Sequence, residues 1–128
     1  MPIALIVEDE PEANRLLAMI VQLRGYKTLS AFTGGEALSA IENESPDVVF
    51  LDLMLPDTNG FEVCRKIKSR QGAHAIPVVM VTARLAEENL AKSELVGADG
   101  YIPKPYTPNQ IFDALTSADE IRKRRLEG

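Results

Sequence analysis

The chain has 128 residues, of which 45% are hydrophobic, and its formal net charge is −5. This is enough apolar material for one ordinary folded domain, and nothing in the composition indicates disorder. The negative charge works against nucleic acid and anionic membrane surfaces as partners of this domain alone, because both require a basic field. The single cysteine, Cys64, cannot form an internal disulfide, so we expect a packed thiol in a reducing compartment, the cytoplasm.

Five apolar runs alternate with five helix-like stretches, which is typical of an α/β sheet with helices on both faces. Strands are predicted near residues 3–7, 27–31, 47–51, 77–82 and 99–102. Helices are predicted near residues 12–24, 35–43, 60–69, 86–96 and from 107 or 108 to the basic end. The apolar run at the start of the chain is too short for a membrane span and has no basic residues before it, so we expect no signal peptide and no membrane partner.

The first predicted helix is apolar on more than one side. Four positions repeat at helical spacing and are expected to pack on the sheet: Leu16, Leu17, Ile20 and Leu23. Other positions of this helix are also apolar: Ala13, Ala18, Met19 and Val21. This is more apolar surface than one buried stripe uses. Two interpretations stay open, a docking face on part of the helix or a helix wedged deeply into the fold.

A glycine pair precedes the second predicted helix. Thr33-Gly34-Gly35-Glu36 has the spacing of a capping box, in which the Thr hydroxyl and the Glu carboxylate bind free amides at the helix start. Glycines before a helix can also hold a phosphate. Here, however, they lack the Gly-x-Gly-x-x-Gly pattern, follow the second strand and have no Walker lysine. The capping role is therefore favoured.

Acidic and polar side chains follow three of the predicted strands. Glu8 and Asp9 come after the first strand, Asp52 after the third and Thr82 at the end of the fourth. Carboxyl ends of an open parallel sheet gather in one crevice, where ligands bind. Carboxylates so close repel one another unless a cation lies among them, and oxygen ligands suit Mg²⁺, or Mn²⁺ in its place. The only histidine, His74, is expected in a surface loop.

A fixed lysine completes the predicted crevice. Lys104 lies between two prolines after the fifth strand, which stiffens its backbone. Together these groups would hold a transferring phosphoryl group, with Asp52 as the nucleophile and with Thr82 and the amide of Ala83 as hydrogen-bond donors. The metal and Lys104 would neutralise the phosphoryl oxygens. The product would be an aspartyl phosphate.

On these residues the chain resembles the CheY-like receiver domain of two-component response regulators, over residues 1–124. The motifs that carry the resemblance are Val7-Glu8-Asp9-Glu10-Pro11, the Asp52 loop through Gly60, Val81-Thr82-Ala83, Gly97-Ala98-Asp99-Gly100-Tyr101 and Lys104-Pro105-Tyr106. The resemblance implies a flavodoxin-like (βα)5 doubly wound sandwich with five parallel strands in the order 2-1-3-4-5. Residues 125–128 are left as a basic tail, either the start of a linker or residues added by cloning.

The resemblance also implies a chemical role for each site residue. Asp52 would accept a phosphoryl group from a sensor histidine kinase or a histidine phosphotransfer protein. Asp9, Asp52 and the carbonyl of Met54 would bind Mg²⁺, with Glu8 helping through water. The domain would catalyse its own phosphorylation and slow hydrolysis, as a signalling switch and not as a metabolic enzyme. We expect Met54 and Arg84 to set the lifetime of the phosphorylated state.

The switch itself maps onto two side chains. Thr82 would move toward the phosphoryl group and Tyr101 would rotate inward, with a cis peptide between Lys104 and Pro105. These changes would remodel the face made by the fourth helix, the fifth strand and the fifth helix. That face is also the predicted homodimer contact, with four apolar residues available: Leu85, Leu90, Leu95 (which equally suits the core) and Phe112. The switched face would act on an output partner or on a fused effector domain.

Three other functions compete with this one. A metal-dependent phosphohydrolase would need a second carboxylate two residues after Asp52, where the chain has Met54. A flavodoxin-like cofactor binder would hold a flavin phosphate on the first loop, which here is acidic and would repel it. A scaffold that works by protein contacts alone would not need the full set of acids, threonine and lysine.

Overall fold

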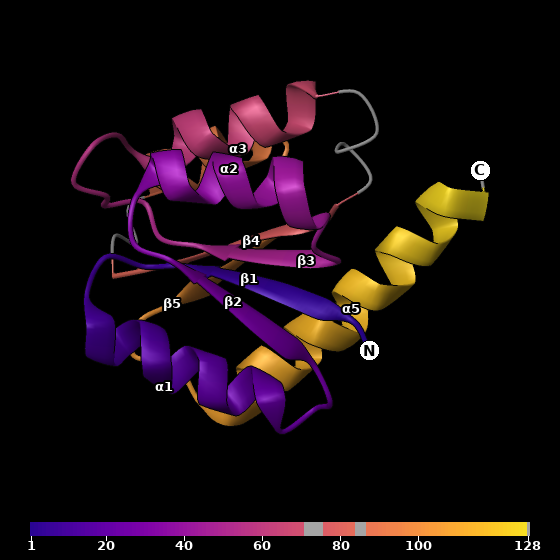
Figure 1. Ribbon diagram of the computed structural model, residues 1–128. Coiled ribbons are helices and arrows are strands. Elements are labelled where there is room, and N and C mark those ends of the chain that lie inside the picture. The colour runs from indigo at the N-terminus through magenta and orange to yellow at the C-terminus, as the bar shows by residue number, and fades with distance from the viewer. Residues whose placement is uncertain (71–75, 84–86, 128) are drawn as a thin grey trace.

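A five-stranded parallel sheet forms the centre of the fold (Figure 1). The computed structural model describes residues 1–70, 76–83 and 87–127. The strands are β1 (Ile3–Val7), β2 (Lys27–Ala31), β3 (Val48–Leu51), β4 (Val78–Thr82) and β5 (Gly100–Pro103). They lie in the order β2-β1-β3-β4-β5, and neighbouring strands pair in parallel. The predicted flavodoxin-like fold and its strand order are confirmed.

Helices cover both faces of the sheet. They are α1 (Pro11–Gln22), α2 (Gly34–Glu44), α3 (Gly60–Ser69), α4 (Glu87–Leu95) and α5 (Pro108–Glu127). Figure 1 shows α1 and α5 on one side of the sheet and α2 and α3 on the other. Pro11 occupies the first turn of α1, where its missing N–H costs nothing, and Glu10 caps that helix by accepting bonds from the amides of Glu12 and Ala13.

The sheet separates two hydrophobic cores, because successive strand residues point to opposite faces. One core joins the sheet to α1 and α5 and contains Ile6, Phe50 and Val81. The other joins it to α2 and α3 and contains the alternate strand residues Leu5 and Leu51. Cys64 belongs to this second core with 0% exposure, and burial raises the pKa of its thiol to about 11. The predicted packed thiol is confirmed.

The buried side of α1 differs from the prediction. It is formed by Asn14, Leu17, Ala18, Ile20 and Val21. The expectation that Leu16 and Leu23 pack on the sheet is wrong. These two residues are 54% and 75% exposed, and Met19 is 57% exposed. Residues 16, 19 and 23 share one side of a helix, and that side lies next to the buried stripe rather than within it. The helix is therefore not wedged deeply in the fold.

The long helix α5 continues beyond the edge of the sheet (Figure 1). Its basic end is held by two ion pairs, Arg122 to Asp47 at 2.9 Å and Arg125 to Asp99. Asp99 also accepts hydrogen bonds from Lys68 at 2.8 Å and from the amide of Val78 at 2.9 Å.

Burial alone would raise the pKa of Asp99, but the hydrogen bonds from Arg125, Lys68 and the Val78 amide together outweigh it and lower the pKa.

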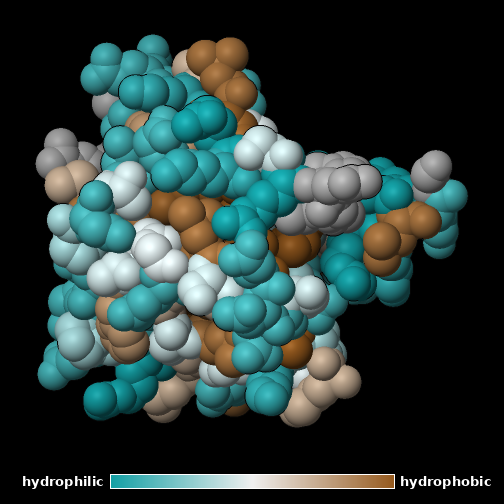
Figure 2. Space-filling model, turned by 45° about the horizontal axis from the view of Figure 1, so that its top comes forward, coloured by the Kyte–Doolittle hydropathy of each residue, from teal (hydrophilic) through white to brown (hydrophobic). Residues whose placement is uncertain are grey.

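The residues that the sequence analysis assigned to a tail after 124 continue α5 through Glu127. No helix in the described ranges has the length and apolar character needed to cross a membrane. On the face shown in Figure 2, hydrophobic side chains form separate patches among hydrophilic ones.

Candidate functional site

The strand register brings the predicted site residues to one edge of the sheet. Val7, the last residue of β1, is paired with Leu51, the last of β3, so Glu8 and Asp52 each stand one residue beyond a matched pair. The amide of Asp52 donates to the carbonyl of Val7 at 3.0 Å, which continues the sheet for one more step. The crevice predicted from the strand ends is therefore formed in the backbone itself.

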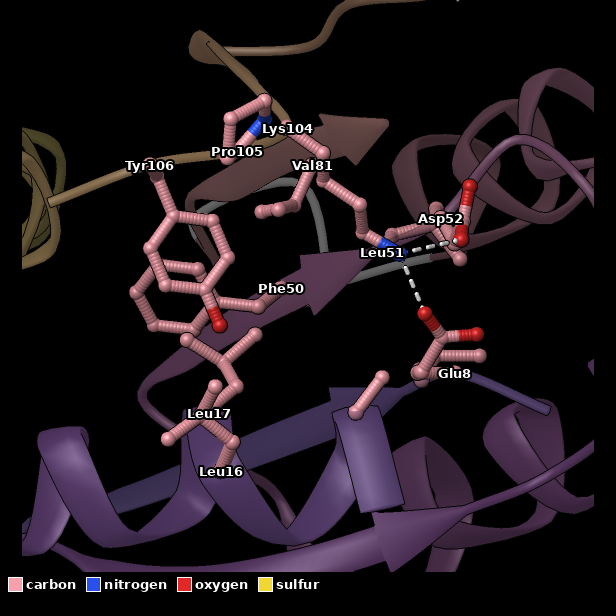
Figure 3. Close-up of a pocket in the computed structure, with 12 residues that line it drawn as sticks. Glu8, Leu16, Leu17, Phe50, Leu51, Asp52, Val81, Lys104, Pro105 and Tyr106 are labelled. Carbon is pink, nitrogen blue, oxygen red and sulfur yellow. Dashed lines mark hydrogen bonds and ion pairs between the residues drawn. The ribbon is translucent and has the colours of Figure 1, made fainter. Parts of the chain in front are cut away.

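A lysine joins the two buried acids of the crevice. The Nζ atom of Lys104 donates to Asp52 Oδ2 at 2.9 Å and also to Glu8 Oε1. Glu8 is 5% exposed and Asp52 is 9% exposed. Figure 3 shows the lysine side chain reaching across from the end of β5 to both carboxylates. Lys104 thus places one positive charge of the chain in contact with both buried carboxylates.

Burial and ion pairing act in opposite directions on this cluster. Burial raises the pKa of Glu8, and the hydrogen bond from Lys104 only partly offsets it. For Lys104, burial disfavours the charged form, but the hydrogen bonds and charges of Glu8 and Asp52 together raise its pKa. The ammonium therefore stays charged at neutral pH. The raised pKa means that Glu8 takes up a proton more easily than it would in water.

The crevice offers oxygen atoms, which are the ligands that a hard cation prefers. Asp9 is exposed beside buried Glu8, and Met54 is 54% exposed. The amide of Met54 donates to Asp52 Oδ1 at 3.2 Å, which fixes the start of the loop after β3. Within the described ranges, no three His, Cys, Asp or Glu side chains are arranged to hold a metal by themselves. The available oxygens fit Mg²⁺, which commonly retains water in its shell.

The remaining predicted residues lie around the same edge. Thr82 is 1% exposed at the end of β4, and its carbonyl accepts a hydrogen bond from the amide of Lys104 at 2.9 Å. Ala83 is exposed. Tyr101 is half-buried in β5, and its pKa is raised by burial and by the charge of Asp52. The peptide between Lys104 and Pro105 is cis, as predicted.

Three predicted residues cannot be placed. Arg84, Leu85 and His74 lie outside the described residues.

A cavity of about 220 Å³ opens beside the charged cluster. Figure 3 shows Leu16, Leu17, Phe50 and Tyr106 along its apolar side and Lys104 with the two acids at its other end. The cavity lies between α1 and the segment after β5. Its walls join the exposed side of α1 to the buried Asp52.

Sequence reasoning missed Asn14, which holds the first acidic loop in place. Its side chain is 1% exposed, and its Nδ2 atom donates to the carbonyls of Ile6, Glu8 and Ala31 at 3.1–3.3 Å. Its Oδ1 atom accepts a hydrogen bond from Ser30 at 2.6 Å. The available signal was a polar residue at a position that helical spacing places with the buried stripe of α1.

Sequence reasoning also missed the fixed shape of the loop after β3. The amide of Gly60 donates to the carbonyl of Leu53 at 2.9 Å, and Met54 pairs with Asn59 in an isolated antiparallel bridge. A Cβ atom on Gly60 would lie 2.5 Å from the carbonyl oxygen of Asp52, so only glycine fits here. The loop therefore leaves the sheet at Asp52, turns and returns to almost the same place.

Comparisons with known proteins agree with this geometry. A family model described as the response regulator receiver domain matches residues 4–116. The Phosphate regulon transcriptional regulatory protein PhoB of Pseudomonas aeruginosa is 37% identical over 111 residues, which are 87% of this chain and 48% of that protein. The chain thus spans about half the length of the curated relatives it matches.

Solved structures give the same result. A CheY-like response regulator receiver domain protein from Methanospirillum hungatei superposes with a TM-score of 0.88 at 30% identity, covering 100% of this chain and 99% of that one. NtrX from Brucella abortus, in complex with ADP, superposes with a TM-score of 0.90 at 31% identity, covering 99% of this chain and 29% of that one. The fold, the strand-end cluster and the family match lead to one conclusion: this chain belongs to the receiver domains of two-component response regulators.

Proposed function

We propose that Asp52 accepts a phosphoryl group from a phosphohistidine on a sensor kinase or on a histidine phosphotransfer protein. The observation that carries the proposal is the contact of Lys104 with buried Asp52 at the carboxyl ends of the strands. A charged ammonium in this place lies where negative charge accumulates during phosphoryl transfer. The family match to receiver domains supports the same assignment.

The transfer needs few groups. An Asp52 carboxylate oxygen attacks the phosphorus, the bond from phosphorus to the donor histidine nitrogen breaks, and that nitrogen keeps the electron pair. Lys104 would exchange part of its contact with Asp52 for a phosphoryl oxygen, while the Thr82 hydroxyl and the Ala83 amide would donate hydrogen bonds to others. Hydrolysis by water then returns the free carboxylate and inorganic phosphate. The domain is in this proposal a switch that catalyses its own modification.

Mg²⁺ is the proposed cofactor, and Mn²⁺ is the expected substitute. Asp9, Asp52 and the Met54 carbonyl would bind it, with Glu8 helping through water. When bound, it would neutralise charge on the phosphoryl oxygens and on the carboxylates. Support comes from the oxygen-only donor set and from exposed Asp9 next to buried Glu8. Lys104 already pairs with Glu8, so less positive charge is needed from a bound ion than three unpaired carboxylates would require.

The exposed side of α1 is the proposed docking surface for the phosphodonor protein. Leu16, Met19 and Leu23 are each more than half exposed there. Leu16 also lines the cavity that ends at Asp52 and Lys104. A partner seated on α1 could therefore place its phosphohistidine over the cavity. The docking-face interpretation of α1 is the one that this exposure favours.

Phosphorylation is proposed to act on the face formed by α4, β5 and α5. Tyr101 lines cavities on both sides of β5, of about 240 Å³ and 170 Å³, which supports a change of its rotamer. Leu90 and Leu95 are 42% and 85% exposed on α4, so Leu95 is not a core residue. They are available for a homodimer contact or for an output partner. Sedimentation with and without a phosphoryl mimic tests the dimer, and a monomer in both conditions would reject it.

Met54 and Arg84 are proposed to set the lifetime of the phosphorylated state. Met54 is exposed two residues beyond Asp52, where it can obstruct water on its way to the phosphorus. Met54→Asn and Arg84→Ala should therefore change the rate of dephosphorylation. Unchanged rates in both variants would reject this role. Binding of nucleic acid by the domain alone is not proposed, and the cytoplasm is its proposed location.

The decisive experiment is intact-protein mass spectrometry after incubation with acetyl phosphate and Mg²⁺. We expect the mass of one phosphoryl group, stable in acid and labile in base, that is absent from Asp52→Asn and from a sample treated with a chelator. No mass gain in a folded wild-type protein would reject the proposal. It would leave the scaffold function, in which the domain acts by protein contacts alone.

A further inference from the structure

The glycine pair at the start of α2 binds an anion, and that anion belongs to the chain itself. The amides of Gly34 and Gly35 donate to the two carboxylate oxygens of Asp57, at 2.8 Å and 3.0 Å. Asp57 lies in the loop that follows Asp52, 22 residues further along the chain than Gly35. These two hydrogen bonds lower the pKa of Asp57. A carboxylate at a helix N-terminus is favoured both by free amides and by the helix dipole.

Asp57 is not needed to begin the helix, because α2 has caps of its own. The Thr33 hydroxyl accepts from the Glu36 amide at 3.0 Å, and the Glu36 side chain accepts from the Phe32 amide at 2.9 Å. The first contact is the one that the capping box predicts, and in the second the Glu36 carboxylate binds the amide one residue before the cap. Asp57 binds the two amides that this box leaves over. The bond therefore connects two segments that are far apart in the chain.

Close packing around this bond explains why the first position of α2 is glycine. A Cβ atom on Gly34 would lie 2.3 Å from Thr58 Cγ2 and 3.1 Å from Val63 Cγ2. The space that a side chain would occupy is thus filled by the tip of the loop after β3 and by α3. The glycines serve this approach of the loop, and a bound phosphate is not needed to account for them.

The loop after β3 is consequently attached at its base and at its tip. Its base is closed by the bond from Gly60 to Leu53 and by the bridge from Met54 to Asn59. Its tip is attached to α2 by Asp57. Met54, whose carbonyl is a proposed Mg²⁺ ligand, lies between Asp52 and this tip. Its backbone is therefore held from both directions.

We propose that Asp57 is a positioning residue, which fixes the loop after β3 on the start of α2 and so sets the affinity of the site for Mg²⁺. This inference rests on the proposed function for its metal ligand, although the attachment of the loop does not. Groups that orient metal ligands typically change metal affinity by about 10–100-fold when they are removed. Asp57 acts through the backbone over several residues, so we expect the lower end of this range.

The test uses one ¹⁵N-labelled sample of each variant and two measurements. Amide hydrogen exchange reports the attachment of the loop, and a titration of amide chemical shifts with Mg²⁺ reports affinity without phosphorylation. The variants are Asp57→Ala and Asp57→Asn. The matched control is Asp113→Ala, because Asp113 is an exposed aspartate on α5 and its removal changes the net charge equally.

In Asp57→Ala we expect faster exchange at the amides of Met54 and Gly60 and an Mg²⁺ affinity lower by about tenfold. The rate of phosphorylation at saturating Mg²⁺ should stay within about twofold of wild type, because no reacting group is lost. Asp57→Asn keeps one acceptor oxygen and should lie between Asp57→Ala and wild type, and Asp113→Ala should behave as wild type.

Two results would overturn the inference separately from the proposed function. Unchanged exchange at Met54 and Gly60, with only Gly34 and Gly35 less protected, would reduce Asp57 to a cap of α2. Unchanged Mg²⁺ affinity in Asp57→Ala would overturn its role at the metal site. If wild type itself binds no Mg²⁺, the proposed cofactor fails, the metal part of the inference fails with it, and the exchange at Met54 and Gly60 still decides the attachment.

Discussion

Removal of Lys104 should expose the electrostatic conflict in the site. Lys104→Met leaves Glu8 and Asp52, with side chains only 7% and 11% exposed, without the ammonium that now contacts both. Breaking a fully buried pair by removing one partner costs about 3–5 kcal/mol. The Lys104 side chain is 27% exposed, so water reaches part of the cluster. We therefore expect the free energy of unfolding at pH 7 to fall by about 2–3 kcal/mol, at the lower end of that range or below it.

The cost should depend on pH in a defined direction. Burial already raises the pKa of Glu8 above its ordinary 4.5, and loss of Lys104 removes the contacts that lower it. A carboxyl group with a raised pKa in the folded state stabilises the protein below its unfolded pKa and loses that contribution as pH rises through the folded value. Glu8 of Lys104→Met should thus take up a proton as pH falls from 7 toward 4.5. The difference from wild type should shrink over this interval.

Urea unfolding followed by circular dichroism, in the presence of a chelator at pH 7 and pH 5, measures both effects. Lys27→Met, which removes an exposed lysine at the start of β2, is the control and should change stability by less than about 0.5 kcal/mol. Glu8→Gln combined with Lys104→Met should recover part of the loss. A cost below about 0.5 kcal/mol, or a cost equal at both pH values, would refute the assigned role of the ammonium.

Three further predictions concern other buried polar groups. Asn14→Ala should lower the free energy of unfolding by about 1–3 kcal/mol, because buried carbonyls lose their hydrogen-bond donor. Arg15→Ala, on the exposed side of α1, should leave it unchanged. Equal effects of the two substitutions in urea unfolding would contradict the role of Asn14. Asp99→Asn should cost about 2 kcal/mol at pH 7. Because the pKa of Asp99 is lowered from 3.8, this cost should decline as the pH falls below 3.8 and through the folded pKa, and a cost that does not decline over that descent would argue against the ion pairs. Cys64, with a pKa of about 11, should resist a thiol reagent at pH 8 until urea unfolds the protein, and rapid labelling of the native state would contradict its burial.

The fold could be predicted because its signals are local. Each strand is a short apolar run closed by turn-forming or polar residues, and every predicted strand and helix occurs within two residues of its expected bounds. The clustering of the charged residues was predictable for the same reason. Glu8, Asp52 and Lys104 each follow a strand directly, so knowledge of a parallel sheet is enough to bring them together.

The errors and omissions arise where a contact depends on the packing of distant segments. The buried stripe of α1 could not be chosen from hydrophobicity, because Leu16 and Leu23 are as apolar as the leucine that is buried. In the sequence, Asp57 looks like an ordinary turn residue, because it lies in the run Pro56-Asp57-Thr58-Asn59-Gly60. Its contacts with Gly34 and Gly35 become visible only when α2 and the loop are placed side by side. Lys104 was expected to neutralise phosphoryl oxygens, and its simultaneous contacts with Glu8 and Asp52 become visible only when the ends of β1, β3 and β5 are placed in the sheet.

Because α5 is long, a small tilt at its first turn would become a larger displacement at its far end. Twenty residues at 1.5 Å each make a rod of about 30 Å, which begins just after Lys104, Pro105 and Tyr106. A tilt of about 5° at its first turn would displace its last turn by about 2.5 Å. At Arg122, about 21 Å from the start of the helix, the same tilt would give about 1.8 Å, a large part of the 2.9 Å that separates Arg122 from Asp47. A tilt of α5 would therefore change the ion pairs of Arg122 and Arg125, and the state of these ion pairs would report the angle of the helix.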